Sequence, residues 1–476
     1  MLKLSPLCLA AVLLLQVPMA AVQAAPVAAA VDQAVAARID AMVAPYYKAR
    51  DPGATLIVTK DGKTLLRKAY GMADVANEVP MQPGATMRLG SITKQFTSAA
   101  ILMLAEEGKL SVSDPINKFL PDYPMHGKNI TIEHLLTHTS GIVSYTNKPN
   151  FMEQMNKNLS VAQMIDSFKD DPLQFEPGAR YAYNNSGYFL LGAIIEKVSG
   201  QPYASFVEQR IFTPLGMRHS AYEGQERDLS QRAAGHSQEK GNFEPSASLS
   251  MSQPYAAGSL VSTVDDLARW DAAVSSGKLL KAASWAQAFK PYTLTDGKST
   301  NYGYGWAVGK LRGATVIAHG GGINGFSTYA LRIPEKNIYV ALLSNADGGL
   351  AEPSMIAKKA AALALGDPFP EMKAVSVSAA ELDALAGVYQ IDEKATRTVR
   401  RDQDHLVMQR GERPAVALYP LGADRFFVKD SLVSFKFVRN AKGVPTQFVI
   451  EDDGVEMVQA RIGDAPAAGT AIALAR

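Results

Sequence analysis

The chain opens with a short charged start and a long run of apolar residues. Met1-Leu2-Lys3-Leu4 is followed by apolar side chains as far as Val17, and then by small residues around Ala24. This layout is typical of a secretory signal peptide, for which we predict residues 1–24 with cleavage near Ala24. The apolar run is shorter than the ~20 residues that span a bilayer, so we expect no stable membrane anchor after cleavage. The mature protein is therefore predicted to be periplasmic or secreted.

Beyond this leader, the apolar pattern changes from helical to β-type. Residues 31–48 carry apolar side chains every three or four positions, which predicts a helix. Residues 54–59 and 64–70 are rich in β-forming residues and flank Asp61-Gly62, which predicts two strands joined by a tight turn. From Ser91 to about Val264 the pattern is mainly helical, with long loops between the helices.

Three β-rich runs return near the end of this region. They are Thr315–Ala318, Phe326–Ile333 and Ile338–Leu343, and a helix is predicted after them from about Ala351 to Leu365. The two N-terminal and three C-terminal strands, with a helical insertion between them, predict one antiparallel sheet with helices on both faces. The predicted fold class is therefore α/β for residues 25–366.

The C-terminal part of the chain has a different character. Gly366–Pro370 breaks the helical pattern, and we interpret residues 367–380 as a linker. From about Leu382, short alternating runs are separated by turns, as in a small all-β barrel. Residues 381–476 are therefore predicted to form a second, β-barrel domain.

Composition narrows the possible partners. The formal net charge of +2 is spread over 476 residues without a basic block, which argues against nucleic acid and favours a small-molecule or peptide substrate. The single cysteine, Cys8, lies inside the predicted leader. The mature chain would then carry no thiol, which excludes disulfides, thiol catalysis and cysteine-bound metals. We expect no cofactor and no metal.

A serine and a lysine at spacing i, i+3 form the first candidate catalytic pair. Ser91 and Lys94 follow Gly90 and open a long amphipathic run, so both side chains project from one helix face. A lysine takes a proton from serine only when its pKa is lowered far enough to leave a free amine. The same spacing recurs at Ser237-x-x-Lys240 in a polar stretch, interpreted as a surface loop, and at Ser275-x-x-Lys278 beyond a helix end.

Two further motifs supply the other parts of an acyl-transfer site. Tyr183 and Asn185 precede a helix predicted from Ser186 to Ser199; a phenol near an ammonium ionises more easily, so Tyr183 is expected to share the base role. A second copy of the spacing, Tyr145–Asn147, is interpreted as part of a polar loop.

His319-Gly320-Gly321-Gly322 ends a β-run. Its glycines are expected to let substrate approach the backbone, and His319 to donate a hydrogen bond or to contribute positive charge. The alternative interpretation is a glycine-rich hairpin corner with a histidine on its rim.

In combination, the three motifs resemble the signature of class C serine β-lactamases and of penicillin-binding-type carboxypeptidases and esterases. The resemblance covers about residues 36–365, and the C-terminal part resembles the lipocalin-like barrel appended to some members. Other segments that look like this family are Thr131–Gly141, Pro177-Gly178, Gly187–Gly192, Gly258–Thr263 and Tyr302–Trp306.

This resemblance implies roles for the motif residues. Ser91 would be acylated, Lys94 and Tyr183 would handle its proton as a coupled pair, and Asn185 would orient the substrate. The backbone N–H groups of Ser91 and Gly322 would form the oxyanion hole. We therefore expect a serine hydrolase that acts through an acyl-enzyme on an ester, an amide or a D-amino-acid-type peptide.

One position departs from the family pattern, and two other functions are open to the same sequence. The β-lactamases usually carry lysine where this chain has His319, which argues against strong β-lactam hydrolysis. A sensor that is acylated without turnover stays open as an alternative. His134 and His138 have zinc-ligand spacing, but Leu135 stands where a metalloprotease has glutamate, so both are interpreted as structural.

Overall fold

The computed structural model describes residues 21–228, 230–393, 395–452 and 455–465. Most of the predicted leader, residues 1–20, lies outside these ranges. Helix α1 runs over Ala21–Val43, so the predicted helix begins earlier and ends earlier than 31–48. In the part of the chain that the structure describes, no helix is both long enough and apolar enough to cross a membrane.

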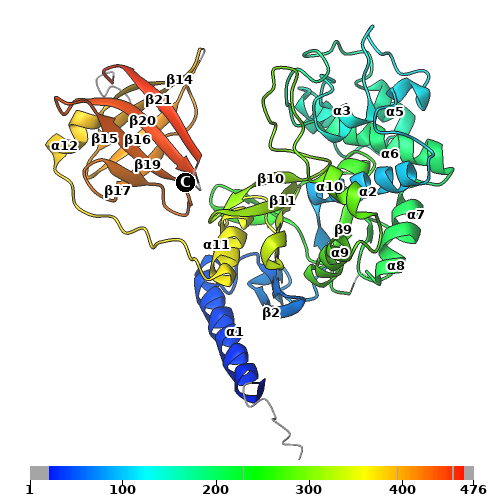
Figure 1. The fold of residues 1–476 in the computed structure, drawn as a ribbon, viewed down its shortest axis with the longest axis horizontal. Helices are drawn as coiled ribbons and strands as arrows, with labels where there is room; N and C mark the ends of the chain where they lie inside the picture. The colour runs from blue at the N-terminus through cyan, green and yellow to red at the C-terminus, as the bar shows by residue number, and fades with distance from the viewer. Residues whose placement is uncertain (1–20, 229, 394, 453–454, 466–476) are drawn as a thin grey trace, which may run out of the picture.

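A six-stranded antiparallel sheet forms the centre of the larger domain (Figure 1). The two N-terminal strands join the C-terminal ones through the pairing of β1 with β13, as the sequence predicts. The tight turn is confirmed, with Asp61 and Gly62 both left-handed at φ 52° and 74°. In sheet order, the strands are β10 (Ala307–Leu311), β11 (Ala314–Ile323), β12 (Phe326–Ile333), β13 (Ile338–Ser344), β1 (Ala54–Lys60) and β2 (Lys63–Tyr70).

Strand β10 was missed from the sequence. It lies at the edge of the sheet, and its residues are mostly exposed or half-buried. The run Ala307–Leu311 contains a glycine and a lysine, so it lacks the apolar signature that marks the inner strands.

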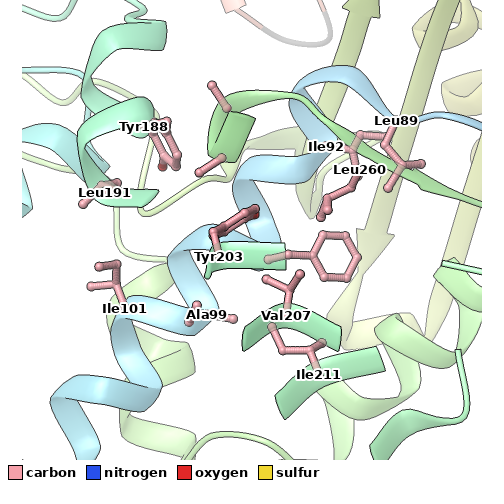
Figure 2. Close-up of a cluster of buried hydrophobic side chains, with 14 of the residues drawn as sticks. Leu89, Ile92, Ala99, Ile101, Tyr188, Leu191, Tyr203, Val207, Ile211 and Leu260 are labelled. Carbon is pink, nitrogen blue, oxygen red and sulfur yellow. The ribbon is translucent and has the colours of Figure 1, made fainter. Parts of the chain in front are cut away.

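Alternating side chains of the sheet enter two separate cores. On one face, Leu56 and Val340 pack with α1 and α11 (Pro353–Leu365). On the other, Ile57 and Ala341 join the larger core that contains α2 (Thr93–Glu106), α6 (Asn185–Ser199) and α9 (Val264–Ser276). Figure 2 shows side chains of α2 and α6 gathered in this larger core, which encloses the beginning of α2.

The insertion between β2 and β10 is mainly helical, as predicted. Its remaining helices are α3 (Ile132–Leu136), α4 (Phe151–Gln154), α5 (Val161–Asp166), α7 (Tyr203–Val207), a π-turn (Glu208–Phe212), α8 (Thr213–Leu215) and α10 (Ala282–Ala288). Short strands accompany them: β3 (Met72–Asp74), β4 (Val79–Pro80), β5 (Met87–Arg88), β6 (Ala221–Tyr222), β7 (His236–Glu239), β8 (Asn242–Pro245) and β9 (Leu260–Ser262). Single 3-10 turns are η1 (Ala44–Tyr46), η2 (Gly90–Ile92), η3 (Ile116–Lys118), η4 (Tyr145–Asn147), η6 (Tyr255–Ala257) and η7 (Pro334–Lys336).

Two segments that the sequence predicts as loops have regular secondary structure. Ser237 lies on β7, which pairs with β8 in a small hairpin, so the surface-loop interpretation of 237–240 is wrong for the strand residues. The polar-loop interpretation of Tyr145–Asn147 is also wrong, because this segment is the turn η4 and Tyr145 is buried in the larger core.

The C-terminal strands close into an eight-stranded antiparallel barrel, as the predicted all-β character requires. Helix α12 (Ala379–Leu385) precedes it and begins within the predicted linker. Side chains fill the barrel interior, including those of Tyr389, Phe426 and Phe448. The strands are β14 (Gly387–Asp392), β15 (Ala395–Asp402), β16 (His405–Arg410), β17 (Val416–Pro420), β18 (Arg425–Phe427), β19 (Ser434–Arg439), β20 (Pro445–Asp452) and β21 (Val455–Gly463). The likeness to lipocalins stays a prediction.

Candidate active site

The serine of the first motif lies on a tight turn against strand β11. Ser91 belongs to the 3-10 turn η2, and α2 begins two residues later at Thr93. Gly90 is left-handed at φ 53°, and a Cβ there would lie 3.1 Å from the backbone nitrogen of Gly322. The left-handed backbone and the short Cβ distance both favour glycine at position 90. The short distance also shows that the Gly322 N–H lies close to the turn that carries Ser91. This proximity is what the predicted oxyanion hole requires.

Gly321 has a packing role that differs from the predicted one. A Cβ at this position would lie 2.0 Å from the carbonyl oxygen of Leu89, and the residue is buried. The missing side chain therefore makes room for the protein's own backbone rather than for substrate. Gly322, in contrast, is exposed and has open space where a Cβ would be.

Lys94 is fully buried beside Ser91. Its Nζ lies 3.0 Å from Ser91 Oγ, 2.9 Å from Asn185 Oδ1 and 2.9 Å from the carbonyl oxygen of Ala257. All three partners are uncharged, and burial holds the pKa of Lys94 well below its ordinary value. A neutral amine has two N–H donors and one lone pair. The two carbonyl oxygens accept the two N–H groups, which leaves the lone pair for the Ser91 hydroxyl.

Tyr183 lies at the same centre, but its expected ionisation is wrong. Its side chain is hydrogen-bonded to Ser91, and Lys94 Nζ lies 4.8 Å from the centre of its ring. The residue is 38 % exposed overall, yet desolvation by the surrounding protein raises the pKa of Tyr183 above its ordinary value. The physical reason is that the surrounding protein desolvates the phenolate more strongly than the Ser91 hydrogen bond stabilises it. The Tyr183 hydroxyl is therefore protonated at neutral pH.

Asn185 is engaged with the lysine at one end and with a neighbouring loop at the other. Its Oδ1 accepts from Lys94, its Nδ2 donates to Thr146 Oγ1 at 3.1 Å, and its backbone N–H donates to Ser144 Oγ at 3.1 Å. Asn185 begins helix α6, whose N-cap residue Asn184 accepts from the Gly187 N–H at 2.8 Å. Asn185 is thus placed to orient the side chain of Lys94. The sequence predicted only that Asn185 orients the substrate.

His319 is buried and both of its nitrogens are occupied. Nδ1 lies 2.6 Å from the carbonyl oxygen of Gly320, so Nδ1 carries the proton, and Nε2 accepts from the Tyr302 hydroxyl at 2.7 Å. Burial, with a contribution from Lys94, lowers the pKa of His319 to about 3. The predicted positive charge is therefore wrong, and the imidazole has no free donor for a substrate. The charged form is disfavoured because the ring is desolvated, and no donor is free because both ring nitrogens are hydrogen-bonded within the protein.

Several residues of the site were not singled out from the sequence. Tyr302, which holds His319, appeared only within a segment that looks like the family, and Thr146, which holds Asn185, belongs to the segment dismissed as a polar loop. The second Tyr-x-Asn spacing was the available signal. It marked a loop of the site, although its own tyrosine points elsewhere and donates to the Gln253 carbonyl oxygen.

The other sequence candidates lie in different surroundings. Lys278 Nζ is exposed and donates to the carbonyl oxygen of Pro214, so it has no buried serine partner. Of the paired histidines, His134 Nδ1 accepts from the Thr131 N–H and His138 Nδ1 accepts from the Asn184 N–H. Each is hydrogen-bonded within the fold, as their structural interpretation requires.

Comparisons with known proteins agree with this geometry. A family model described as Beta-lactamase matches residues 28–365. Penicillin-binding protein 4* of Bacillus subtilis (strain 168) is 28 % identical over 430 residues, which cover 84 % of this chain and 93 % of that protein.

Two solved structures are similar over most of their own length. The octameric penicillin-binding protein homologue from Pyrococcus abyssi has a TM-score of 0.64 and 27 % identity, covering 91 % of this chain and 98 % of that one. A D-stereospecific amidohydrolase from Streptomyces sp. has a TM-score of 0.55 and 29 % identity, covering 67 % of this chain and 94 % of that one. The family model spans well over half of the chain and includes all the residues around Ser91. This chain therefore belongs to the beta-lactamase family of serine hydrolases.

Proposed function

We propose that this protein is an exported hydrolase that cleaves amides, esters or D-amino-acid-type peptides through an acyl-enzyme at Ser91. The observation that carries the proposal is the buried amine of Lys94, which is bonded only to uncharged groups. A lysine in such surroundings is a base at neutral pH, and a base 3.0 Å from a serine hydroxyl produces a nucleophile.

In acylation, Ser91 Oγ attacks the substrate carbonyl carbon while its proton moves to Lys94 Nζ. The backbone N–H groups of Ser91 and Gly322 stabilise the resulting oxyanion. The bond to the leaving nitrogen or oxygen then breaks, and the leaving group takes a proton from the Tyr183 hydroxyl. Lys94 returns the proton to Tyr183, so the pair ends the step neutral and Ser91 carries the acyl group.

In deacylation, a water molecule replaces the leaving group. Its oxygen attacks the acyl carbon, its proton passes to Lys94, and the bond to Ser91 Oγ breaks as the oxygen regains a proton from the same amine. The products are the free acid and the starting enzyme. Lys94 is thus the base in both half-reactions.

The third motif favours substrates without a carboxylate near the scissile bond. His319 is neutral and internally paired, so it supplies no cation to hold such a group. This supports amides and esters over β-lactams. The similarity to a D-stereospecific amidohydrolase adds support for a D-amino-acid acyl group.

Export rests on the sequence of the first residues. The charged start, the apolar run and the small residues near Ala24 favour a signal peptide and a periplasmic or secreted enzyme. N-terminal sequencing of the mature protein from cell fractions tests this part, with a new N-terminus just after Ala24 expected.

The direct test uses mass spectrometry with a β-lactam, a short-chain ester and a D-amino-acid amide. Wild type is expected to gain one acyl group on Ser91, and Ser91→Ala to gain none while keeping its melting temperature. Ser237→Ala is the matched control, because it has the same serine-to-lysine spacing on an exposed hairpin. Continued hydrolysis by Ser91→Ala would overturn the proposal.

A sensor that is acylated without turnover is the second candidate, favoured by the similarity to proteins named as penicillin-binding. Burst kinetics with a chromogenic ester separate the two functions. A hydrolase continues after the first equivalent of product, whereas a sensor stops there.

A further inference from the structure

We propose that His138 is a positioning residue for Tyr183, holding the phenol where it can deliver its proton to the leaving group. The inference rests on the proposed function, because it assigns Tyr183 the proton-donor role. His138 takes no part in the proton transfers among Ser91, Lys94 and Tyr183.

His138 is tied to the chain on both sides of Tyr183. The backbone N–H of Ala182 donates to the carbonyl oxygen of His138, and the backbone N–H of Asn184 donates to its Nδ1, both at 3.0 Å. The His138 ring also packs against the Tyr183 ring, with the ring centres 4.3 Å apart. One residue therefore fixes the backbone before the tyrosine, the backbone after it and the face of its ring.

The imidazole carries a cost that simple packing would avoid. Because Nδ1 accepts a hydrogen bond, the neutral ring must carry its proton on Nε2, and this buried atom has no hydrogen-bond partner. The residue is only 1 % exposed, and the rings of Tyr188 and Tyr302 lie 5.1 and 4.8 Å from its own. An unpaired buried donor destabilises the folded protein. An apolar residue would fill this space without that cost.

The backbone of His138 is strained as well. Its φ of 59° is left-handed, a region that side-chain-bearing residues rarely adopt. This conformation belongs to the same residue whose carbonyl oxygen and Nδ1 receive the two flanking N–H groups. Strain and an unpaired donor together at one residue beside a catalytic group indicate a requirement of the site rather than of the core.

Two substitutions separate the contacts. His138→Phe keeps a ring against Tyr183 but removes the Nδ1 acceptor, whereas His138→Asn keeps an acceptor oxygen, tolerates the left-handed backbone and removes the ring. His134→Phe is the matched control: its Nδ1 also accepts a backbone N–H, from Thr131 at the N-cap of α3, but its ring packs against Tyr292 instead. It is expected to leave kcat unchanged.

The readout compares a D-amino-acid anilide with the corresponding nitrophenyl ester. An anilide needs a proton on its leaving group and a nitrophenolate does not, so a misplaced Tyr183 slows the anilide selectively. We expect His138→Phe and His138→Asn to lower kcat on the anilide by about 10- to 100-fold, with little change in KM, and on the ester by less than about 3-fold. In a Tyr183→Phe background, His138→Phe is expected to cause no further loss on either substrate.

Each result bears on the inference. Equal losses on both substrates, or a full further loss in the Tyr183→Phe background, would overturn it and leave His138 with a purely structural role. Unchanged kcat in both variants would overturn it too. The Asn variant keeps the test usable if the Phe variant fails to fold. Hydrolysis that survives Ser91→Ala would instead defeat the proposed function itself, so the two failures are distinguishable.

Discussion

Two interiors of this molecule exclude water and are built in opposite ways. The barrel interior is filled mainly with aromatic and aliphatic side chains, and the hydroxyl of its buried Tyr389 donates to the Leu385 carbonyl oxygen at 2.8 Å. The interior around Lys94 contains an amine, two imidazoles and several phenols, and the pKa values of Lys94 and His319 both fall. The barrel interior stabilises the fold. The interior around Lys94 lowers the stability of the fold, because a lysine is buried there without a charged partner beside Ser91.

The barrel contacts the larger domain on the side of the sheet away from Ser91. Leu432 of the barrel packs against the core that contains α1 and α11, on one face of the sheet, whereas Leu89 and Ile92, which flank Ser91, belong to the core on the other face. The barrel therefore packs on the face of the sheet opposite to the one that carries Ser91.

The largest effect is expected from making the catalytic interior resemble that of the barrel. Lys94→Met removes the base and is expected to lower the acylation rate by about 10²- to 10⁴-fold, measured by stopped-flow with a chromogenic ester. Lys278→Met, at an exposed lysine of the same spacing, is the control. An acylation rate within 3-fold of wild type, about 0.7 kcal/mol, would show that Lys94 is not the base.

The same substitution has a definite pH signature in stability. Burial favours the neutral form of Lys94 in the folded state, so between its lowered pKa and the ordinary value of 10.5 the unfolded chain binds more protons. Wild-type stability therefore rises with pH across this window. Urea unfolding should show the stability of Lys94→Met relative to wild type falling as pH rises toward 10.5. A difference independent of pH would contradict the depressed pKa.

A smaller effect is expected from adding charge to the catalytic interior. His319→Lys places an ammonium where the β-lactamases usually carry one, and should raise activity on a β-lactam relative to a neutral ester by about 10-fold, the size of one charge-assisted hydrogen bond. His319→Gln, neutral and of similar length, should leave this ratio unchanged. If the ratio of β-lactam to ester activity is the same in both variants, the residue at position 319 does not control the recognition of a substrate carboxylate.

The smallest effect on catalysis is expected from opening the barrel. Phe448→Ala removes a fully buried ring and should destabilise the barrel by about 3–5 kcal/mol, seen in urea unfolding followed by amide hydrogen exchange of the barrel strands. The kcat should stay unchanged while the barrel is folded. Val444→Ala, at a residue 45 % exposed just before the same strand, is the control. A parallel loss of kcat would show that the barrel supports the active site.

The sequence predicted what depends on local pattern. The strand pair around Asp61-Gly62, the helix α6 closed by Gly200 and the choice of Ser91 among three similar spacings all follow from the order of apolar, turn and capping residues. These signals are local, so one sequence suffices to find them.

What the sequence did not predict depends on contacts between distant segments. The ionisation predicted for Tyr183 was wrong because only the fold shows that the phenol is desolvated. Only the fold shows, too, that the Lys94 amine is bonded to uncharged groups as far apart in sequence as Asn185 and Ala257. The roles of Thr146 and Tyr302 were missed for the same reason, since each holds a site residue from another loop. Edge strand β10 lacked an apolar pattern because it is mostly exposed.

The most direct test of this account is the charge of Lys94 in the intact enzyme. Lysine labelled with carbon-13 at the ε position gives one NMR resonance per residue, and comparison with Lys94→Met assigns the relevant one. The account predicts the chemical shift of a neutral amine for this resonance at pH 7. A shift typical of an ammonium that persists to about pH 10 would contradict it, because Ser91 would then have no base beside it.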